Sequence, residues 1–119
     1  MRFLMMHRLD ESLPEAWNPS PEFIEKMGGI IQDWAAKGVL ITAEGVHKSE
    51  KGALVRKTSN GQNTATDGPF TEAKEVIGGF ALINAKDRAE AVAYAQAYAD
   101  LFGEVSVEVR QVVEFDEIG

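Results

Sequence analysis

The sequence predicts an α+β fold built from one sheet, two helices and an inserted β-hairpin. The elements run strand, helix, strand, then, after a hairpin at about residues 53 to 66, strand, helix, strand. This order is that of the ferredoxin-like split βαβ arrangement. The first strand is apolar on both faces, so the sheet needs cover on two sides. A second copy of the chain is the simplest cover, and we therefore expect a homodimer.

Composition limits the classes of function. A chain of 119 residues with a hydrophobic fraction of 45% is expected to form one domain, residues 1–119. Its net charge of −7 and scattered basic residues argue against a nucleic-acid partner, since phosphate contacts need clustered Lys and Arg. Without a signal peptide or an apolar span, we expect a cytoplasmic protein that has no membrane partner.

The residues that bind metals and cofactors are scarce. There is no cysteine, and the two histidines do not have the spacing of a zinc site. The sequence also lacks a phosphate-binding glycine loop, a dinucleotide fingerprint and a nucleophile elbow. We therefore expect no metal and no cofactor.

The first strand is expected at residues 2–8, and His7 lies at its C-terminal end. Two interpretations of His7 stay open. It is either a strand-end histidine that water or a carbonyl group satisfies, or a polar group at the mouth of a pocket. The proline-containing loop that follows carries Trp17, which we expect to pack as a lid or as an interface anchor.

The first helix has clear start and stop signals. Ser20 is the expected N-cap, Pro21 occupies the first helical position, and Gly38 is the expected C-cap. Apolar residues at helical spacing form one stripe: Phe23, Met27, Ile30, Ile31 and Trp34. We interpret Gly28-Gly29 within this helix as a point where the helix approaches the sheet closely.

The second strand is expected at residues 39–46, where Glu44 is an acid among apolar neighbours and shares a face with Leu40. A hairpin turn follows at residues 59–62, because Asn-Gly favours tight turns between strands. The next strand is expected at residues 77–83, and Gly78-Gly79 at its start suggests a close backbone approach.

The second helix is expected to begin with the capping pair of Asp87 and Glu90. Its predicted inner stripe consists of Val92, Ala95, Ala99 and Phe102, with Tyr94 and Tyr98 beside it. The last strand is expected at residues 104–115, and the tail at 116–119 is expected to fray.

One stretch, residues 66–75, has more chemistry than a simple loop requires. Asp67 and Gly68 supply a carboxylate and a flexible residue, Pro69 turns the chain, and Phe70 is a large apolar anchor. Asp67 is either an acceptor for the amides of its own turn or a carboxylate that orients a histidine. The charges at 72, 74 and 75 are most simply a solvated turn.

This stretch resembles the DGPF motif of the YCII-related family. Further resemblance lies in Gly38-Val39-Leu40, Glu44-Gly45, Gly78-Gly79-Phe80 and the residues 107–110. It implies a dimeric α+β barrel in which two sheets pack face to face. The family's reactions are largely unassigned, and some members occur beside or fused to sigma-factor-like regulators.

Family members carry a histidine and an aspartate that are thought to form an acid/base pair. The resemblance places the aspartate at Asp67, and His7 and His47 are the histidines available. We therefore predict His7 and Asp67 as catalytic residues, because His47 falls in an exposed turn.

Four further residues are predicted to contact a ligand: Glu44, Phe70, Glu108 and Arg110. Glu108 and Arg110 share one strand face. They form either a salt bridge at the dimer interface or an anion clamp inside the barrel.

Two hypotheses of function follow. The first is a small cofactor-free enzyme that transfers protons on a small organic substrate, as in a lyase, isomerase or dehydrochlorinase-like step. The second is a noncatalytic dimer that binds a small ligand or a protein partner, with a link to transcriptional regulation.

Overall fold

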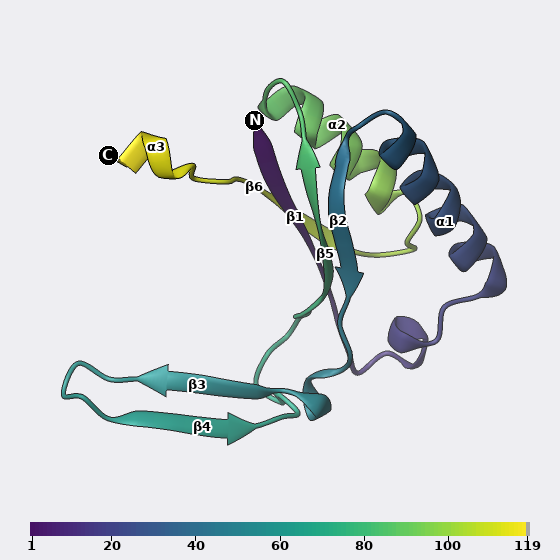
Figure 1. Ribbon diagram of the computed structural model, residues 1–119. Helices are drawn as coiled ribbons and strands as arrows, with labels where there is room; N and C mark the ends of the chain where they lie inside the picture. The colour runs from purple at the N-terminus through teal and green to yellow at the C-terminus, as the bar shows by residue number, and fades with distance from the viewer. Residues whose placement is uncertain (119) are drawn as a thin grey trace.

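The computed structural model describes residues 1–118, in which one four-stranded sheet is the central layer (Figure 1). Its strands lie in the order β2-β5-β1-β6, and each neighbouring pair is antiparallel. The strands of the sheet are β1 (Arg2–Leu9), β2 (Leu40–Gly45), β5 (Val76–Asn84) and β6 (Ser106–Gln111). The two long helices, which pack on it to form the helix–sheet layer, are α1 (Pro21–Ala36) and α2 (Arg88–Ala99). The predicted ferredoxin-like α+β fold is confirmed.

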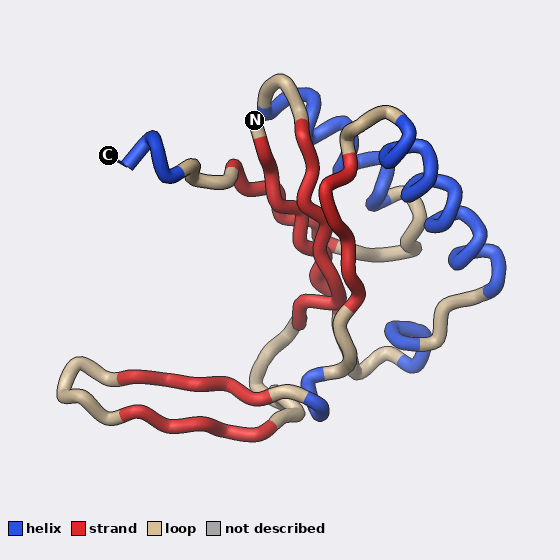
Figure 2. Tube along the Cα trace, viewed as in Figure 1, coloured by secondary structure: helices blue, strands red, loops and turns tan. Residues whose placement is uncertain are grey.

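Five smaller elements complete the described chain. The hairpin consists of β3 (Ala53–Lys57) and β4 (Asn63–Asp67), which form a separate two-stranded sheet (Figure 2). Short 3-10 turns lie at Pro14–Trp17 and Ser49–Lys51, and α3 covers Phe115–Ile118. The tail predicted to fray is therefore helical up to residue 118, while Gly119 lies outside the described residues. None of the helices within residues 1–118 is long and apolar enough to cross a membrane.

Both long helices begin where the sequence predicts. The Ser20 side chain accepts a hydrogen bond from the amide of Phe23 at 3.1 Å, and Asp87 accepts one from the amide of Glu90 at 2.9 Å. These caps satisfy amide groups that the first helical turn leaves free. The two helices lie on the same face of the sheet (Figure 1), as the apolar stripes predict.

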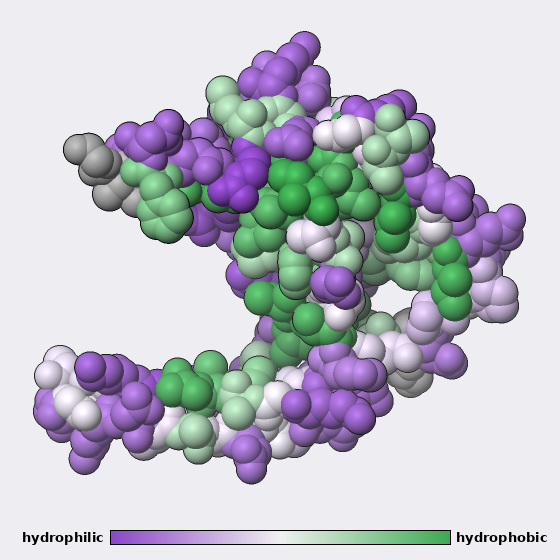
Figure 3. All heavy atoms as spheres, viewed as in Figure 1, coloured by the Kyte–Doolittle hydropathy of each residue, from purple (hydrophilic) through white to green (hydrophobic). Residues whose placement is uncertain are grey.

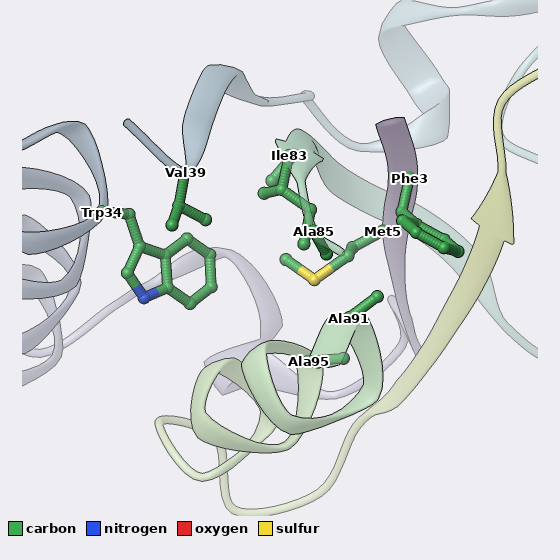
Figure 4. Packing of buried hydrophobic residues seen from close by; sticks show 9 residues of the cluster. Phe3, Met5, Trp34, Val39, Ile83, Ala85, Ala91 and Ala95 are labelled. Atoms are coloured by element: carbon green, nitrogen blue, oxygen red, sulfur yellow. The ribbon is translucent and has the colours of Figure 1, made fainter. Parts of the chain in front are cut away.

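The hydrophobic core lies between this face and the helices (Figure 4). Phe3, Met5 and Ile83 are no more than 2% exposed. Trp34 of α1 belongs to the same cluster, and the remaining members of the core are small or β-branched: Val39, Ala81, Ala85, Ala91 and Ala95. Full burial of each large side chain contributes about 1.5–3 kcal/mol, so this cluster stabilises the helix–sheet layer.

The inner face of α2 differs from the predicted stripe. Ala91 and Ala95 are buried, Tyr94 and Tyr98 are half-buried, and Val92 is exposed. The buried residue at the start of α2 is Ala91 and not the predicted Val92, whereas Ala95 is buried as predicted. The first position was wrong because α2 is rich in alanine, so its apolar periodicity is weak. The two tyrosines therefore face the sheet side of the helix.

Two other predictions are also corrected. A Cβ atom added at Gly28 or Gly29 would meet nothing within 4 Å, so neither glycine marks a close approach to the sheet. A β-bulge between Leu40 and Thr42 breaks the expected alternation in β2. Leu40 pairs with Ile83 and packs against the core, whereas Glu44 pairs with Phe80 on the opposite face.

The face of the sheet that the helices leave uncovered is here called the open face. It carries Leu4 and Met6 of β1 with their partners Leu82 and Phe80 of β5, all half-buried. The hairpin and α3 both project from the sheet on this side (Figure 1), and hydrophobic atoms follow the concave surface between them (Figure 3). The radius of gyration is 16.4 Å, compared with about 13.5 Å for a compact domain of this length.

Candidate functional site

A cavity of about 960 Å³ opens at the end of the helix–sheet layer that the core does not fill. Its walls are the helix α1, the strands β1, β2 and β5, the segment that joins β1 to α1, and the end of α2 with the loop that follows it. Most of the wall is apolar, and the side chains that matter below are His7, Trp17, Phe23, Met27, Tyr98 and Phe102. A volume of this size is typical of pockets for small organic molecules.

His7 is the buried titratable side chain in this wall. It lies on the helix-covered face of β1 and is 8% exposed. A Cβ atom at Gly78 would lie 2.5 Å from its Nε2 atom, and one at Gly79 would lie 2.8 Å from its Cε1 atom. The close backbone approach predicted here is found at Gly79, where a Cβ atom would lie 2.8 Å from the carbonyl oxygen of Glu44. At Gly78 the close neighbours are side chains, and both glycines give room to the imidazole ring.

Tyr98 of α2 holds the ring from the other side. Its hydroxyl group is hydrogen-bonded to His7 Nδ1 at 2.5 Å. The rings of Phe102 and Phe23 extend this contact, since Phe102 lies 5.0 Å between centroids from both His7 and Phe23. The four rings form a continuous aromatic wall, at distances where such pairs attract one another.

Burial sets the protonation of this pair. It lowers the pKa of His7 and raises the pKa of Tyr98 to about 12. At neutral pH both side chains are therefore uncharged. A neutral imidazole has one bare nitrogen and one N–H group, so it can act as a proton acceptor or donor. Since Tyr98 occupies Nδ1, Nε2 is the atom left for a ligand.

Asp67 occupies a different part of the chain. It is exposed at the end of β4, where its backbone pairs with Ala53 of the hairpin. It is not among the residues that line the cavity of His7, and within residues 1–118 no hydrogen bond joins the two side chains. His47 is exposed, as expected.

The turn after Asp67 is held by a serine that the sequence analysis missed. The amide of Phe70 donates to Ser49 Oγ at 2.8 Å, and the amide of Gly68 donates to the carbonyl of Gly52 at 2.9 Å. The amides of the turn thus bind these partners rather than the side chain of Asp67. Glycine is required at 68, because a Cβ atom there would lie 1.6 Å from the carbonyl oxygen of Ser49.

Ser49 is in turn fixed by Glu11. The Ser49 amide donates to Glu11 Oε2 at 3.0 Å, and its hydroxyl group donates to Glu11 Oε1. We call Glu11, Ser49, Gly68 and Phe70 the Ser49 latch. No local sequence signal could have identified it, because Glu11 and Ser49 are 38 residues apart. Phe70 also lines a second, shallower hollow of about 790 Å³ beside the latch.

The remaining predicted ligand contacts lie on the open face. Glu108 Oε2 lies 3.1 Å from Arg110 Nη1, so these two predicted residues form an ion pair. Glu108 Oε1 forms a second ion pair with Arg8 Nη2, also at 3.1 Å. Glu108 and Arg110 pair with Met6 and Leu4 of β1, which places the charges among apolar side chains of the open face. The strand register places the side chain of Glu44 on this face as well, and Glu44 is also one of the residues that line the cavity.

The comparison with known families agrees with the resemblance to the YCII-related family. The YCII-related domain matches residues 1–116, which is almost the whole chain. A search of curated proteins returned no match. Because the family match extends from β1 into α3 and includes the histidine, the glycine pair and the latched turn, the chain belongs to the YCII-related domain family.

Proposed function

We propose that the protein binds a small organic molecule in the helix–sheet cavity and that His7 transfers a proton on it without a cofactor. One observation carries this proposal. A buried and neutral imidazole borders a large apolar cavity, with one ring nitrogen bound to Tyr98 and the other without a hydrogen bond within residues 1–118. A general base needs this arrangement, because a fixed ring and a pKa near or below the working pH keep it ready to accept a proton.

Tyr98 takes the positioning role that the resemblance assigns to Asp67. Its hydroxyl group fixes the orientation of the ring, as a carboxylate does in a histidine–aspartate pair. A phenol with a pKa of about 12 stays protonated at neutral pH. It therefore adds no negative charge beside His7, and the imidazole remains a mild base.

Proton exchange tests this proposal without knowledge of the natural substrate. Aromatic carbonyl compounds with an acidic C–H group are screened for binding by NMR, and deuterium uptake from the solvent is then followed in the binders. We expect His7→Gln to slow exchange by about a hundredfold or more. Tyr98→Phe should slow it less, and Asp67→Asn should leave it unchanged.

Other outcomes would decide between the hypotheses. Full exchange in His7→Gln would contradict the proposal. Binding that persists in wild type with no exchange in any binder would favour the noncatalytic ligand-binding protein. Slow exchange in Asp67→Asn, with an unchanged melting temperature, would restore Asp67 as the partner of His7.

We also propose that the open face packs against a second copy of the chain. The half-buried residues Leu4, Met6, Phe80 and Leu82 support this, because an apolar strip at the centre of a sheet is costly to leave in water. The large radius of gyration and the 92% exposure of Phe115 on the projecting tail support it too. Sedimentation should give a dimer at low micromolar concentration, and a stable monomer would contradict this.

A further inference from the structure

The cavity of His7 carries a charge pattern that its apolar walls do not require. Its lining includes four acids, Asp10, Glu44, Glu75 and Glu104, and one basic residue, Lys74. The register of β2 places the side chain of Glu44 on the open face, so it is not counted among the charges that face the cavity. Lys74 lies near enough to Asp10 to contribute to the lowering of the Asp10 pKa, although hydrogen bonds from Ser12 contribute more. Asp10 is therefore ionised at neutral pH and offsets the charge of Lys74.

Two carboxylates then remain at the border of the cavity without a lining cation. Glu75 precedes β5 and accepts a hydrogen bond from the neutral hydroxyl group of Ser106 at 3.4 Å. Glu104 lies in the loop before β6, two residues after Phe102. A cleft with low-dielectric walls and charges of one sign focuses the electric field and concentrates ions of the opposite sign.

The walls between these charges favour a flat cation. His7, Tyr98, Phe102 and Phe23 form a continuous wall of rings, and Trp17 also lines the cavity, with its indole N–H bound to the carbonyl of Val46 at 2.9 Å. Aromatic faces attract an organic cation through their negative quadrupole. The neutral imidazole adds a hydrogen-bond acceptor or donor in the same wall and imposes no repulsion on a positive charge.

We propose that the ligand of this cavity is an aromatic organic cation, such as a protonated aromatic amine. This inference rests on the proposed function, because it assumes that the helix–sheet cavity is the ligand site. The observation that supports it is that the aromatic wall and the acids Glu75 and Glu104 line the same cavity. The same juxtaposition selects against carboxylates and phosphates of similar shape.

Three probes of matched shape test the class of ligand: 2-naphthylmethylamine, 2-naphthylmethanol and 2-naphthoate. Dissociation constants are measured by NMR titration at pH 7.5, with the side-chain signals of His7 and Trp17 as reporters of the cavity. We expect the amine to bind about tenfold more tightly than the alcohol, and the carboxylate to bind more weakly than either. The preference for the amine should fall as salt is added.

Two double variants test whether Glu75 and Glu104 cause the preference for the amine. Glu75→Gln with Glu104→Gln should reduce the preference for the amine to about threefold or less, while the alcohol binds as in wild type. The matched control is Glu25→Gln with Glu50→Gln, which removes two exposed acids that do not line the cavity. This control changes the net charge equally and should keep the tenfold preference.

The outcomes separate this inference from the proposed function. Equal binding of the amine and the alcohol to the wild-type protein would overturn the cation class while the cavity stands as a ligand site. An equal loss in the control variant would overturn it too, because the preference would then reflect net charge alone. If none of the probes shifts the signals of His7 and Trp17, both the ligand class and the proposed site are contradicted.

Discussion

The two ends of the helix–sheet layer differ in how well they are filled. At one end, Phe3, Ile83 and Trp34 are buried in one cluster, and alanines let α2 approach the sheet (Figure 4). At the other end, Phe23 and Met27 of α1 remain half-buried around a cavity of about 960 Å³. The same two helices thus build a packed end and a hollow end.

The difference shows where stability and function lie in the molecule. Packed apolar side chains contribute to the free energy of folding, whereas an unfilled volume lined by rings contributes little to it. His7 belongs to the hollow end, where its burial costs stability unless it stays neutral. The packed end therefore supports the fold, and the hollow end is available for a ligand.

Truncation of a large side chain to alanine should lower the free energy of unfolding more at the packed end than at the hollow end. This is the largest effect that we expect. Ile83→Ala should lower the free energy of unfolding by about 2–5 kcal/mol, because it leaves a cavity in a filled core. Phe23→Ala should cost less than half as much, since Phe23 already borders empty space. Urea unfolding of both variants measures the two losses. Equal losses would mean that the hollow end is packed in solution.

A methyl group at Gly79 should disturb the hollow end without touching the core. It would lie 2.8 Å from the carbonyl oxygen of Glu44 and 2.8 Å from His7 Cε1. We expect Gly79→Ala to lower the free energy of unfolding by about 1–3 kcal/mol, because neither the backbone nor the enclosed ring can move freely. The NMR signals of the His7 ring should shift as well. Unchanged stability and signals would contradict the close contact.

Low pH should reduce the stability of the folded protein, because protonation of the buried His7 is unfavourable. Burial lowers the pKa of His7 in the folded protein below its ordinary value of about 6.5. Between these two values the unfolded chain binds more protons, so stability rises with pH. The contribution of neutral His7 to the free energy of unfolding is complete above about pH 6.5, and it is lost as the pH falls through the pKa of His7 in the folded protein. Melting curves from pH 7.5 to 5 should show a steeper decline in wild type than in His7→Gln.

The control for this pH effect is His47→Gln, which removes the exposed histidine. Its melting temperature should decline with acid as steeply as that of the wild type. If His47→Gln flattened the curve and His7→Gln did not, the buried neutral state of His7 would be contradicted.

The smallest effect is expected in the helix that spans both ends. Gly28→Ala or Gly29→Ala should raise the free energy of unfolding by about 0.5–1 kcal/mol, because alanine restricts the unfolded chain and has the higher helix propensity. The added methyl group meets nothing within 4 Å. Thermal melting measures the gain. A loss of stability would place these glycines against a neighbour, as the sequence first suggested.

Local signals predicted the packed end well. Caps at Ser20 and Asp87, the stripe of α1 and the two apolar faces of β1 depend on residues close in sequence, and each is found in the structure. The alanine-rich helix α2 was harder to predict, because small residues fit on either side of its true inner face. Tyr98 was predicted beside the inner stripe and is half-buried, but its hydrogen bond to His7 was not predicted.

The candidate site depended on contacts that no local pattern encodes. His7 was predicted as a site residue, but its hydrogen-bond partner Tyr98 lies 91 residues away. The motif at Asp67 was identified, yet its turn is held by Ser49 and Glu11 from two other segments. Charge and turn propensity in a single stretch indicate that a region matters, but they do not identify its partners.

The Ser49 latch also determines where the chain can tolerate insertions and deletions. The amide of Gly68 bonds to the carbonyl of Gly52, so the chain enters and leaves the hairpin at a single point. Paired insertions or deletions within residues 53–67 would lengthen or shorten the ribbon without shifting the register of β5. The tip at Asn60-Gly61 is exposed, and a reporter domain inserted there should leave the cavity of His7 intact.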